Sequence, residues 1–215
     1  MYVPKHPNDS LVLSYLALRK AIGFIGLALP FALIFGRFAL QGVAIEPSIS
    51  DYYYSAMGDV FVGSLCAIGV FLLTYRGLER RDDIAGNLAC VFAIGVAVFP
   101  TAQSETPVGV ERLVGMAHYI SAALMFMILA YFCLVLFVKT DPNKPMTPEK
   151  QMRNRVYRGC GGVILACIAA IGIVKLALPP ALIAPYDPVF WLESIAVVAF
   201  GFSWLVKGET ILKDD

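Results

Sequence analysis

The chain has 215 residues, of which 59% are hydrophobic and 15% charged, with a formal net charge of +1 and a mean hydropathy of +0.73. A soluble domain carries roughly 25% charged residues, so this chain lacks the polar surface that a water-soluble fold needs. The small net charge gives no indication of nucleic-acid binding, and we expect none. The composition therefore predicts a membrane protein.

The apolar residues fall into six blocks of about the 20 residues that cross a bilayer of roughly 30 Å. In chain order they cover residues 18–40, 56–75, 84–100, 113–138, 156–178 and 189–206. We interpret each block as a helix, because an open strand leaves backbone groups unpaired in lipid and no block alternates like a barrel strand. The third block is short, so its helix is expected to begin in the preceding turn or to stand nearly upright. The predicted fold class is all-α: a polytopic bundle of six transmembrane helices that forms one domain over residues 1–215.

Basic residues gather on one side of these blocks. All but three of the 17 lysines and arginines lie before or at the very start of the first block, between the second and third, between the fourth and fifth or at the start of the fifth, or after the sixth. The three exceptions are Arg37, Arg112 and Lys175. Since Lys and Arg mark the cytoplasmic side of a membrane protein, both termini are predicted to be cytoplasmic. The predicted location is a membrane crossed several times, which is the inner (cytoplasmic) membrane if the source is bacterial.

Cysteines and glycines are interpreted as packing residues. None of the five cysteines lies in an outward-facing loop, and the sequence contains no CxxC pair. Small residues let membrane helices approach closely, and we assign that role to seven glycines. They are Gly23, Gly26, Gly58, Gly63, Gly159, Gly161 and Gly162. None of the pairs among them has clean GxxxG spacing, so no specific dimer is inferred and homo-oligomerisation is left open.

A short polar string, SISDYYY at residues 48–54, separates the first two apolar blocks. It combines a carboxylate with two hydroxyls and three phenols at a predicted membrane boundary. Ionisable residues at membrane depth are costly and often functional, and the topology places several in the outer leaflet near this string. They are Arg37, Asp51, Asp59, His118, Lys175 and Glu193. The sequence therefore predicts an outward-opening polar pocket in which Asp51, His118 and Glu193 approach one another.

Three short motifs occur in the order of a known family: ISD at 49–51, His118 early in the fourth block, and WLES at 191–194 running into AFGF at 199–202. This order resembles the DRAM-like family of six-span proteins, the damage-regulated autophagy modulators with their FRAG and SFK relatives. The resemblance implies a membrane-lipid context: autophagy modulation, phosphoinositide-kinase regulation, or remodelling of the lipid on glycosylphosphatidylinositol anchors. By motif match it implies functional roles for Ser50, Asp51, His118 and Glu193. The chain departs from the family pattern after the first motif, where three tyrosines and Asp59 replace a glycine and a Pro-Glu pair.

Each candidate residue also has a structural interpretation. His118 is an interhelical hydrogen-bonding residue, a general base or lipid-phosphate contact, or a metal ligand. Asp51 is a loop cap or a functional carboxylate, and Glu193 is a salt-bridge partner of Lys175 or Arg37 or a catalytic group. The tyrosines favour an interfacial aromatic belt over a substrate box. No metal site is assigned, and Asp51, His118 and Glu193 are the ligands if one exists.

Three classes of function stay open. We favour an integral membrane protein whose outer-leaflet pocket binds or modulates membrane lipid. Its ligand-binding residues are predicted to be Ser50, Asp51, Asp59, Lys175 and Arg37. The alternative is an integral membrane lipid hydrolase or acyltransferase that uses His118 with Asp51 and Glu193, so whether the chain is an enzyme is left open. A small-solute transporter is less favoured, since the sequence shows no inverted repeat and no ionisable residues through the midplane. Membrane lipids are the expected partners, and no cofactor is identified.

Overall fold

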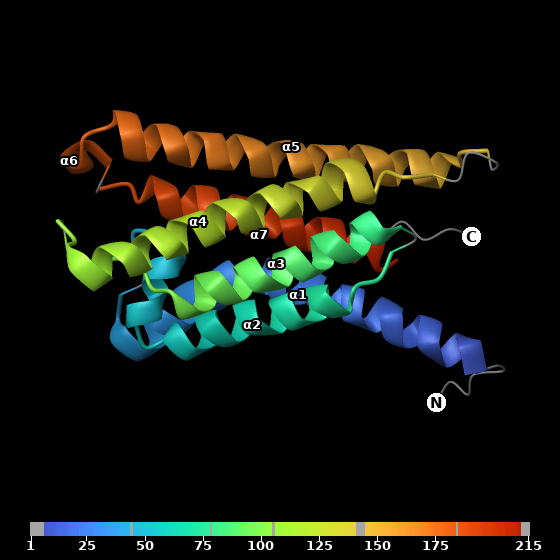
Figure 1. The fold of residues 1–215 in the computed structure, drawn as a ribbon, viewed down its shortest axis with the longest axis horizontal. Coiled ribbons are helices and arrows are strands. Elements are labelled where there is room, and N and C mark those ends of the chain that lie inside the picture. Colours follow the sequence, from blue (N-terminus) through green and yellow to red (C-terminus); the bar gives the residue numbers. More distant parts are fainter. Residues whose placement is uncertain are drawn as a thin grey trace.

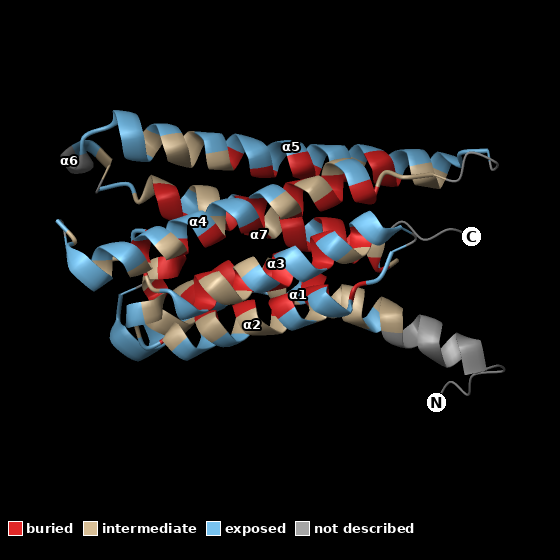
Figure 2. Cartoon of the chain, in the orientation of Figure 1, coloured by how far each residue is buried: buried red, intermediate tan, exposed pale blue. Residues whose placement is uncertain are grey.

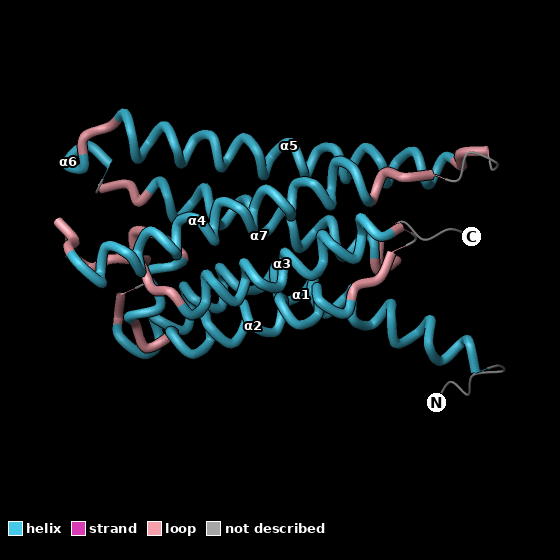
Figure 3. The backbone as a smooth tube through the Cα atoms, in the orientation of Figure 1, coloured by secondary structure: helices cyan, strands magenta, loops and turns pink. Residues whose placement is uncertain are grey.

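The computed structural model describes residues 7–43, 45–77, 79–104, 106–140, 145–183 and 185–211. Most of these residues are helical and none lies in a strand, and six helices of 17 or more residues run along the long axis (Figure 1). They are α1 (Pro7–Gln41), α2 (Gly58–Thr74), α3 (Arg80–Val98), α4 (Gly109–Tyr131), α5 (Pro148–Ala177) and α7 (Pro188–Lys207). The loops that connect them lie at the two ends of the bundle (Figure 3). The predicted all-α fold class is confirmed.

Three shorter elements accompany these helices in the described part of the chain. The 3-10 helix η1 (Ser50–Tyr54) lies between α1 and α2, and α6 (Pro180–Ile183) lies between α5 and α7. The π-helical segment η2 (Phe132–Leu136) continues α4 directly. Local sequence explains two helix starts: Glu79 and Asp82 form a capping box at α3, and the Thr147 hydroxyl accepts a hydrogen bond from the Lys150 amide at α5.

The six long helices form a closed ring, in the order α1, α2, α3, α4, α5, α7 and back to α1. In Figure 1, α4 and α5 lie close together near η2 and diverge toward the end where α6 connects α5 to α7. The opposite end of the bundle is called the basic end below. It holds Arg19, Arg76, Lys139 and Lys207, which lie around one cavity.

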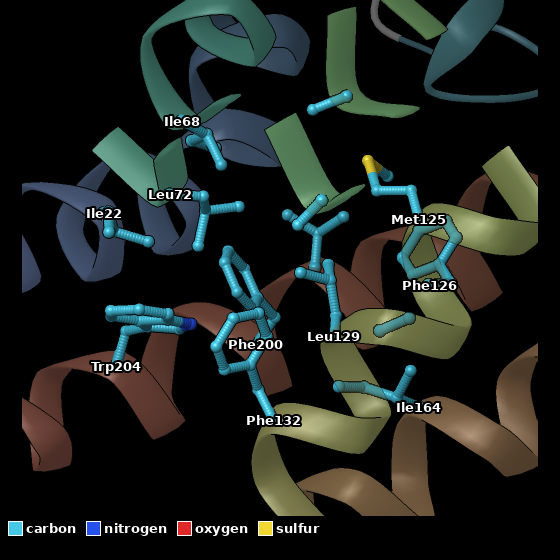
Figure 4. Packing of buried hydrophobic residues seen from close by; sticks show 14 of the residues in the cluster. Ile22, Ile68, Leu72, Met125, Phe126, Leu129, Phe132, Ile164, Phe200 and Trp204 are labelled. Carbon is cyan, nitrogen blue, oxygen red and sulfur yellow. The ribbon is translucent and has the colours of Figure 1, made fainter. Parts of the chain in front are cut away.

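Aromatic residues fill the centre of the ring toward the basic end. Trp204 of α7 and Phe132 of η2 have no exposed surface, and their ring centroids lie 5.6 Å apart. The Tyr75 ring meets Trp204 edge-on at 5.3 Å. Figure 4 shows Trp204 and Phe132 pointing into the same interior as Leu72 and Leu129 from other helices. By contrast, α5 is exposed along most of its outer face (Figure 2), so its environment must tolerate apolar side chains.

Helices α1 and α7 approach closely at glycines. A Cβ atom placed on Gly201 would lie 2.8 Å from the backbone oxygen of Gly23 and 2.5 Å from the backbone nitrogen of Leu27. The predicted role in close helix approach is therefore confirmed for Gly23. It is wrong for three other glycines, because no described atom lies within 4 Å of a Cβ built on Gly63, Gly159 or Gly162. All five cysteines are free and four are buried, as a packing role requires.

Among the described residues, four helical segments are long and apolar enough to cross a membrane, judged by length and composition. They are Tyr15–Gln41, Gly109–Leu136, Pro148–Ala177 and Pro188–Lys207. The apolar helix Gly58–Thr74 has 17 residues, and α3 begins with the charged sequence RRDD at 80–83. The third predicted block does begin in the preceding turn, at Arg80. These features are those of a multi-pass membrane protein.

Candidate functional site

The polar string of residues 48–54 folds against the end of the bundle that lies opposite the basic end. Two backbone contacts tie it to the start of α7. The Phe190 amide donates a hydrogen bond of 3.1 Å to the Pro47 carbonyl, and the Ile49 amide donates one of 2.7 Å to Oε2 of Glu193. Ile49 itself is buried, so the string covers the bundle end instead of standing in solvent.

The carboxylate of Asp51 is held by two hydroxyl groups. Ser48 Oγ donates to Oδ2 at 2.8 Å, and Thr101 Oγ1 donates to Oδ1 at 2.7 Å. The Asp51 amide donates in turn to Ser48 Oγ at 3.1 Å, which closes a local turn. Thr101 belongs to the connection between α3 and α4, and its carbonyl accepts a bond of 2.7 Å from the Tyr54 hydroxyl. Asp51 therefore joins two connections that are distant in the sequence, as the predicted loop cap would.

His118 lies about 14 Å along α4 from Gly109, at 1.5 Å per residue, and is 2% exposed. Its Nδ1 atom lies 2.6 Å from the backbone oxygen of Phe99, the C-cap residue that directly follows α3. A carbonyl oxygen only accepts, so we assign the proton to Nδ1, and in the neutral ring Nε2 carries the lone pair. The interhelical hydrogen bond that we considered for His118 is confirmed.

A cavity of about 140 Å³ lies between the polar string, α4, α5 and α7. The polar residues that line it are Ser48, Ser50, Asp51, Thr101, His118, Lys175 and Glu193, with Tyr119 beside them. Apolar side chains form the rest of the wall, among them Phe126, Ile168 and Ile171. Asp51, His118 and Glu193 thus face one space, and this part of the prediction is confirmed. Their chemical roles stay predictions.

The cavity reaches the surface between α4 and α5. Three of its lining residues are exposed: Tyr119 and Ala123 on α4, and Lys175 in the last turn of α5. This is the end at which the two helices diverge in Figure 1. The opening therefore faces laterally, across the helix axes, and not along them.

Two residues predicted for the pocket do not line this cavity. Arg37 forms an ion pair of 2.6 Å with Glu46 and donates a bond of 2.8 Å to the Ile45 carbonyl. Burial raises the pKa of Glu46, and the guanidinium of Arg37 opposes that rise. Asp59 is exposed in the first turn of α2. Arg37 therefore fixes the corner after α1, and Asp59 is an exposed residue outside the cavity lining.

The carboxylate of Glu193 is held by a backbone amide and not by a cation. Ion pairs between described residues do not include Glu193, so the alternative salt bridge to Lys175 or Arg37 is wrong. Among all the residues that the structure describes, no three His, Cys, Asp or Glu side chains are grouped closely enough to hold a metal ion. The spacing of Asp51, His118 and Glu193 accordingly does not support the metal-site alternative.

The three tyrosines of the string have different environments. Tyr52 has no exposed surface, and its ring packs 6.0 Å from Phe190 and 5.8 Å from the Arg37 guanidinium. The predicted interfacial belt is therefore wrong for Tyr52, which belongs to the core. Tyr54 is 44% exposed. Burial raises the pKa of both phenols, so Tyr52 and Tyr54 stay protonated at neutral pH.

Sequence reasoning missed Ser48 and Thr101 as partners of Asp51. Ser48 has a local signal, since a serine three residues before an aspartate is a common side-chain turn pattern. Thr101 has none, because it lies 50 residues further along the chain. Comparisons of the chain with protein-family models, curated proteins and solved structures give no match.

Proposed function

We propose that the chain is an integral membrane protein that binds a membrane lipid, with the lipid head group in the cavity beside Asp51. The observation that carries this proposal is that polar and apolar residues line one cavity, which opens between α4 and α5 toward the surroundings of the helices. Ligand sites commonly combine a few placed polar groups with apolar lining. Here Asp51, His118 and Glu193 supply the polar groups, and Ile168 and Ile171 line the path toward the surface.

Six membrane spans are part of the proposal. At 1.5 Å per residue, α2 is about 26 Å long and α3 about 29 Å, close to the hydrocarbon thickness of roughly 30 Å. Both helices take part in the ring beside α1 and α4, so a membrane around the ring surrounds them as well. By the distribution of Lys and Arg, the basic end faces the cytoplasm and the cavity lies in the outer leaflet.

The charges around the cavity suggest how a head group binds. Lys175, exposed at the opening, is suited to a lipid phosphate. The carboxylates of Asp51 and Glu193 lie further in and accept hydrogen bonds from an amine or hydroxyl of the head group. Acyl chains leave between α4 and α5, where Ala122 and Ala123 leave room. A phospholipid whose head group carries hydrogen-bond donors fits this order of charges.

Membership of the DRAM-like family is proposed on the same grounds. The four residues implied by the motif match are Ser50, Asp51, His118 and Glu193, and all four line the one cavity. They come from three separate parts of the chain, so their convergence supports a shared site. The family's lipid-related roles agree with the proposed ligand.

The test is lipid analysis by mass spectrometry after purification from native membranes in mild detergent. The Asp51→Asn, Glu193→Gln double variant removes both charges with little change in shape. Asp59→Asn removes an exposed carboxylate at the same end and serves as the control. We expect wild type and control to retain one enriched lipid class, and the double variant to lose it about tenfold, since hydrogen bonds to charged groups contribute roughly 1.5–3 kcal/mol. Identical lipid profiles in all three proteins contradict the proposal.

A lipid hydrolase or acyltransferase is the second candidate, and one observation favours it. His118 has its Nδ1 proton fixed on the Phe99 carbonyl, which leaves Nε2 as the basic nitrogen of a residue lining the cavity. No hydrogen bond between described residues joins His118 to Asp51 or Glu193, so a carbonyl takes the place of the orienting carboxylate. Cells lacking the gene, complemented with wild type or His118→Ala, separate the two candidates. A lipid species changed in the deletion and restored by wild type alone indicates an enzyme.

A further inference from the structure

A second polar cavity, of about 340 Å³, lies at the basic end of the bundle. Four cationic side chains line it, from α1, α7 and two connections: Arg19, Arg76, Lys139 and Lys207. One carboxylate, that of Asp82, shares the lining. The cavity is therefore strongly positive, and it lies at the opposite end of the helices from the site beside Asp51.

The carboxylates near this cavity are already paired with one cation. Lys139 Nζ lies 3.1 Å from Glu79 Oε2 and 3.5 Å from Asp82 Oδ2. Within the described part of the chain, the ion pairs include neither Arg19, Arg76 nor Lys207. Three basic side chains thus line one cavity without a described carboxylate in ion-pair distance.

Arg19 and Lys207 are held in place by aromatic rings and a backbone carbonyl, and not by an anionic group. The Arg19 guanidinium lies 4.2 Å above the Tyr15 ring and donates a long bond of 3.4 Å to the Lys207 carbonyl, and its Nε atom is buried without an acceptor. The Lys207 ammonium lies 5.3 Å from the centre of the Phe137 ring. Sheltered cations without an anion are costly, so an anion placed between them is stabilised by both.

The position of this cavity along the helices indicates where the anion comes from. Two of the candidate membrane spans end at residues that line it, namely Leu136 and Lys207. Tyr75, which follows directly on α2, lines it too. The cavity therefore lies where the hydrocarbon layer ends and the lipid phosphates of that leaflet begin.

We propose that Arg19, Arg76 and Lys207 bind a phosphate group, which this position assigns to an anionic phospholipid of the adjoining leaflet. Guanidinium groups hold phosphate through paired hydrogen bonds, and a lysine ammonium adds a point charge. This site shares no residue with the cavity beside Asp51. Its test is therefore independent of the function proposed for that cavity.

The experiment titrates the full chain in detergent with phosphatidic acid or phosphatidylcholine and counts bound lipids by native mass spectrometry. We expect wild type to bind phosphatidic acid about tenfold more tightly than phosphatidylcholine, and Arg19→Gln or Lys207→Gln to lose most of this preference. If these two variants fail to fold, Arg76→Gln, a substitution at an exposed position, replaces them and is expected to lose the same preference. Arg155→Gln removes an exposed cation of α5 outside the cavity lining and keeps the preference.

Thermal unfolding distinguishes binding from a purely structural role. Without anionic lipid, Lys207→Met is expected to raise the unfolding temperature, because it removes a sheltered amine that has no anionic partner among the described residues. With phosphatidic acid, wild type is expected to become the more stable protein. A third outcome is that sodium phosphate raises the unfolding temperature of wild type but not of Lys207→Gln, while neither lipid is preferred. This outcome supports the site and assigns it to a soluble phosphate. The proposal is overturned if wild type binds both lipids equally and sodium phosphate does not stabilise it. It is also overturned if Arg155→Gln loses as much of the preference for phosphatidic acid as the variants of the cavity do.

Discussion

Glu193 of α7 accepts a hydrogen bond of 2.7 Å from the backbone amide of Ile49, a residue that lies 144 positions earlier in the chain. This bond fixes the polar string over the end of the bundle. The same carboxylate lines the candidate cavity, so one side chain both holds the cover and faces the proposed ligand. A substitution that preserves the acceptor should therefore separate the two roles.

Glu193→Ala is expected to destabilise the protein by about 1–3 kcal/mol, because it leaves the buried Ile49 amide without an acceptor. Glu193→Gln retains an acceptor oxygen and should stay within about 1 kcal/mol of wild type. The measurement is the free energy of unfolding in detergent. Equal destabilisation by the two substitutions would show that the hydrogen bond is not what holds the string.

The bond between Thr101 and Asp51 should appear as a coupling energy. Thr101→Val removes the donor, Asp51→Ala removes the acceptor, and the double variant completes a cycle. We expect the two changes to couple by about 1.5–3 kcal/mol, the range for hydrogen bonds to charged groups. Thr106→Val, a nearby exposed threonine, should show no coupling to Asp51→Ala. Additive effects at Thr101 would contradict the observed geometry.

The helices and the convergence of site residues could be predicted from the sequence, because both follow from hydropathy and topology. An apolar block of about 20 residues predicts a membrane helix whatever its neighbours are. Asp51, His118 and Glu193 are expected together because the predicted topology places Asp51 in a connection on the outer side, and His118 and Glu193 near the outer ends of their helices. No finer geometry was needed for that expectation.

The sequence did not reveal how the connections fold over the bundle end. Tyrosine is a residue type typical of the membrane–water interface, yet the 3-10 helix η1 places the Tyr52 side chain in the core. Arg37 forms an ion pair with Glu46, which belongs to an irregular segment whose sequence has no periodic pattern. Asp59 lies only eight residues beyond Asp51, but it falls on the exposed face of α2, and that face is set by tertiary packing.

The close crossing of α1 and α7 predicts a strong effect at Gly201. Gly201→Ala forces a methyl group against the backbone of Gly23 and Leu27, and should destabilise the protein by about 1–3 kcal/mol. Gly162→Ala is the matched control, since nothing described lies within 4 Å of its added carbon. The control should be neutral or slightly stabilising in unfolding experiments, because alanine favours helix more than glycine. A well-tolerated Gly201→Ala would contradict this close packing.

The proposed orientation predicts a labelling pattern in intact cells. Asp59→Cys places a thiol on an exposed position near the cavity end, and Arg155→Cys places one near the basic end. A membrane-impermeant maleimide should label the first variant at once and the second after the membrane is permeabilised. Wild type should stay largely unlabelled, because four of its five cysteines are buried. The reverse pattern would place the basic end outside.

The most direct test of the lipid-binding account is an experimental structure of the full chain in nanodiscs made from native lipid. We expect lipid density with its head group in the cavity, within hydrogen-bonding distance of Asp51 or Glu193, and acyl chains passing between α4 and α5. A cavity that holds water alone, with every ordered lipid on the outer faces of the helices, would contradict the account.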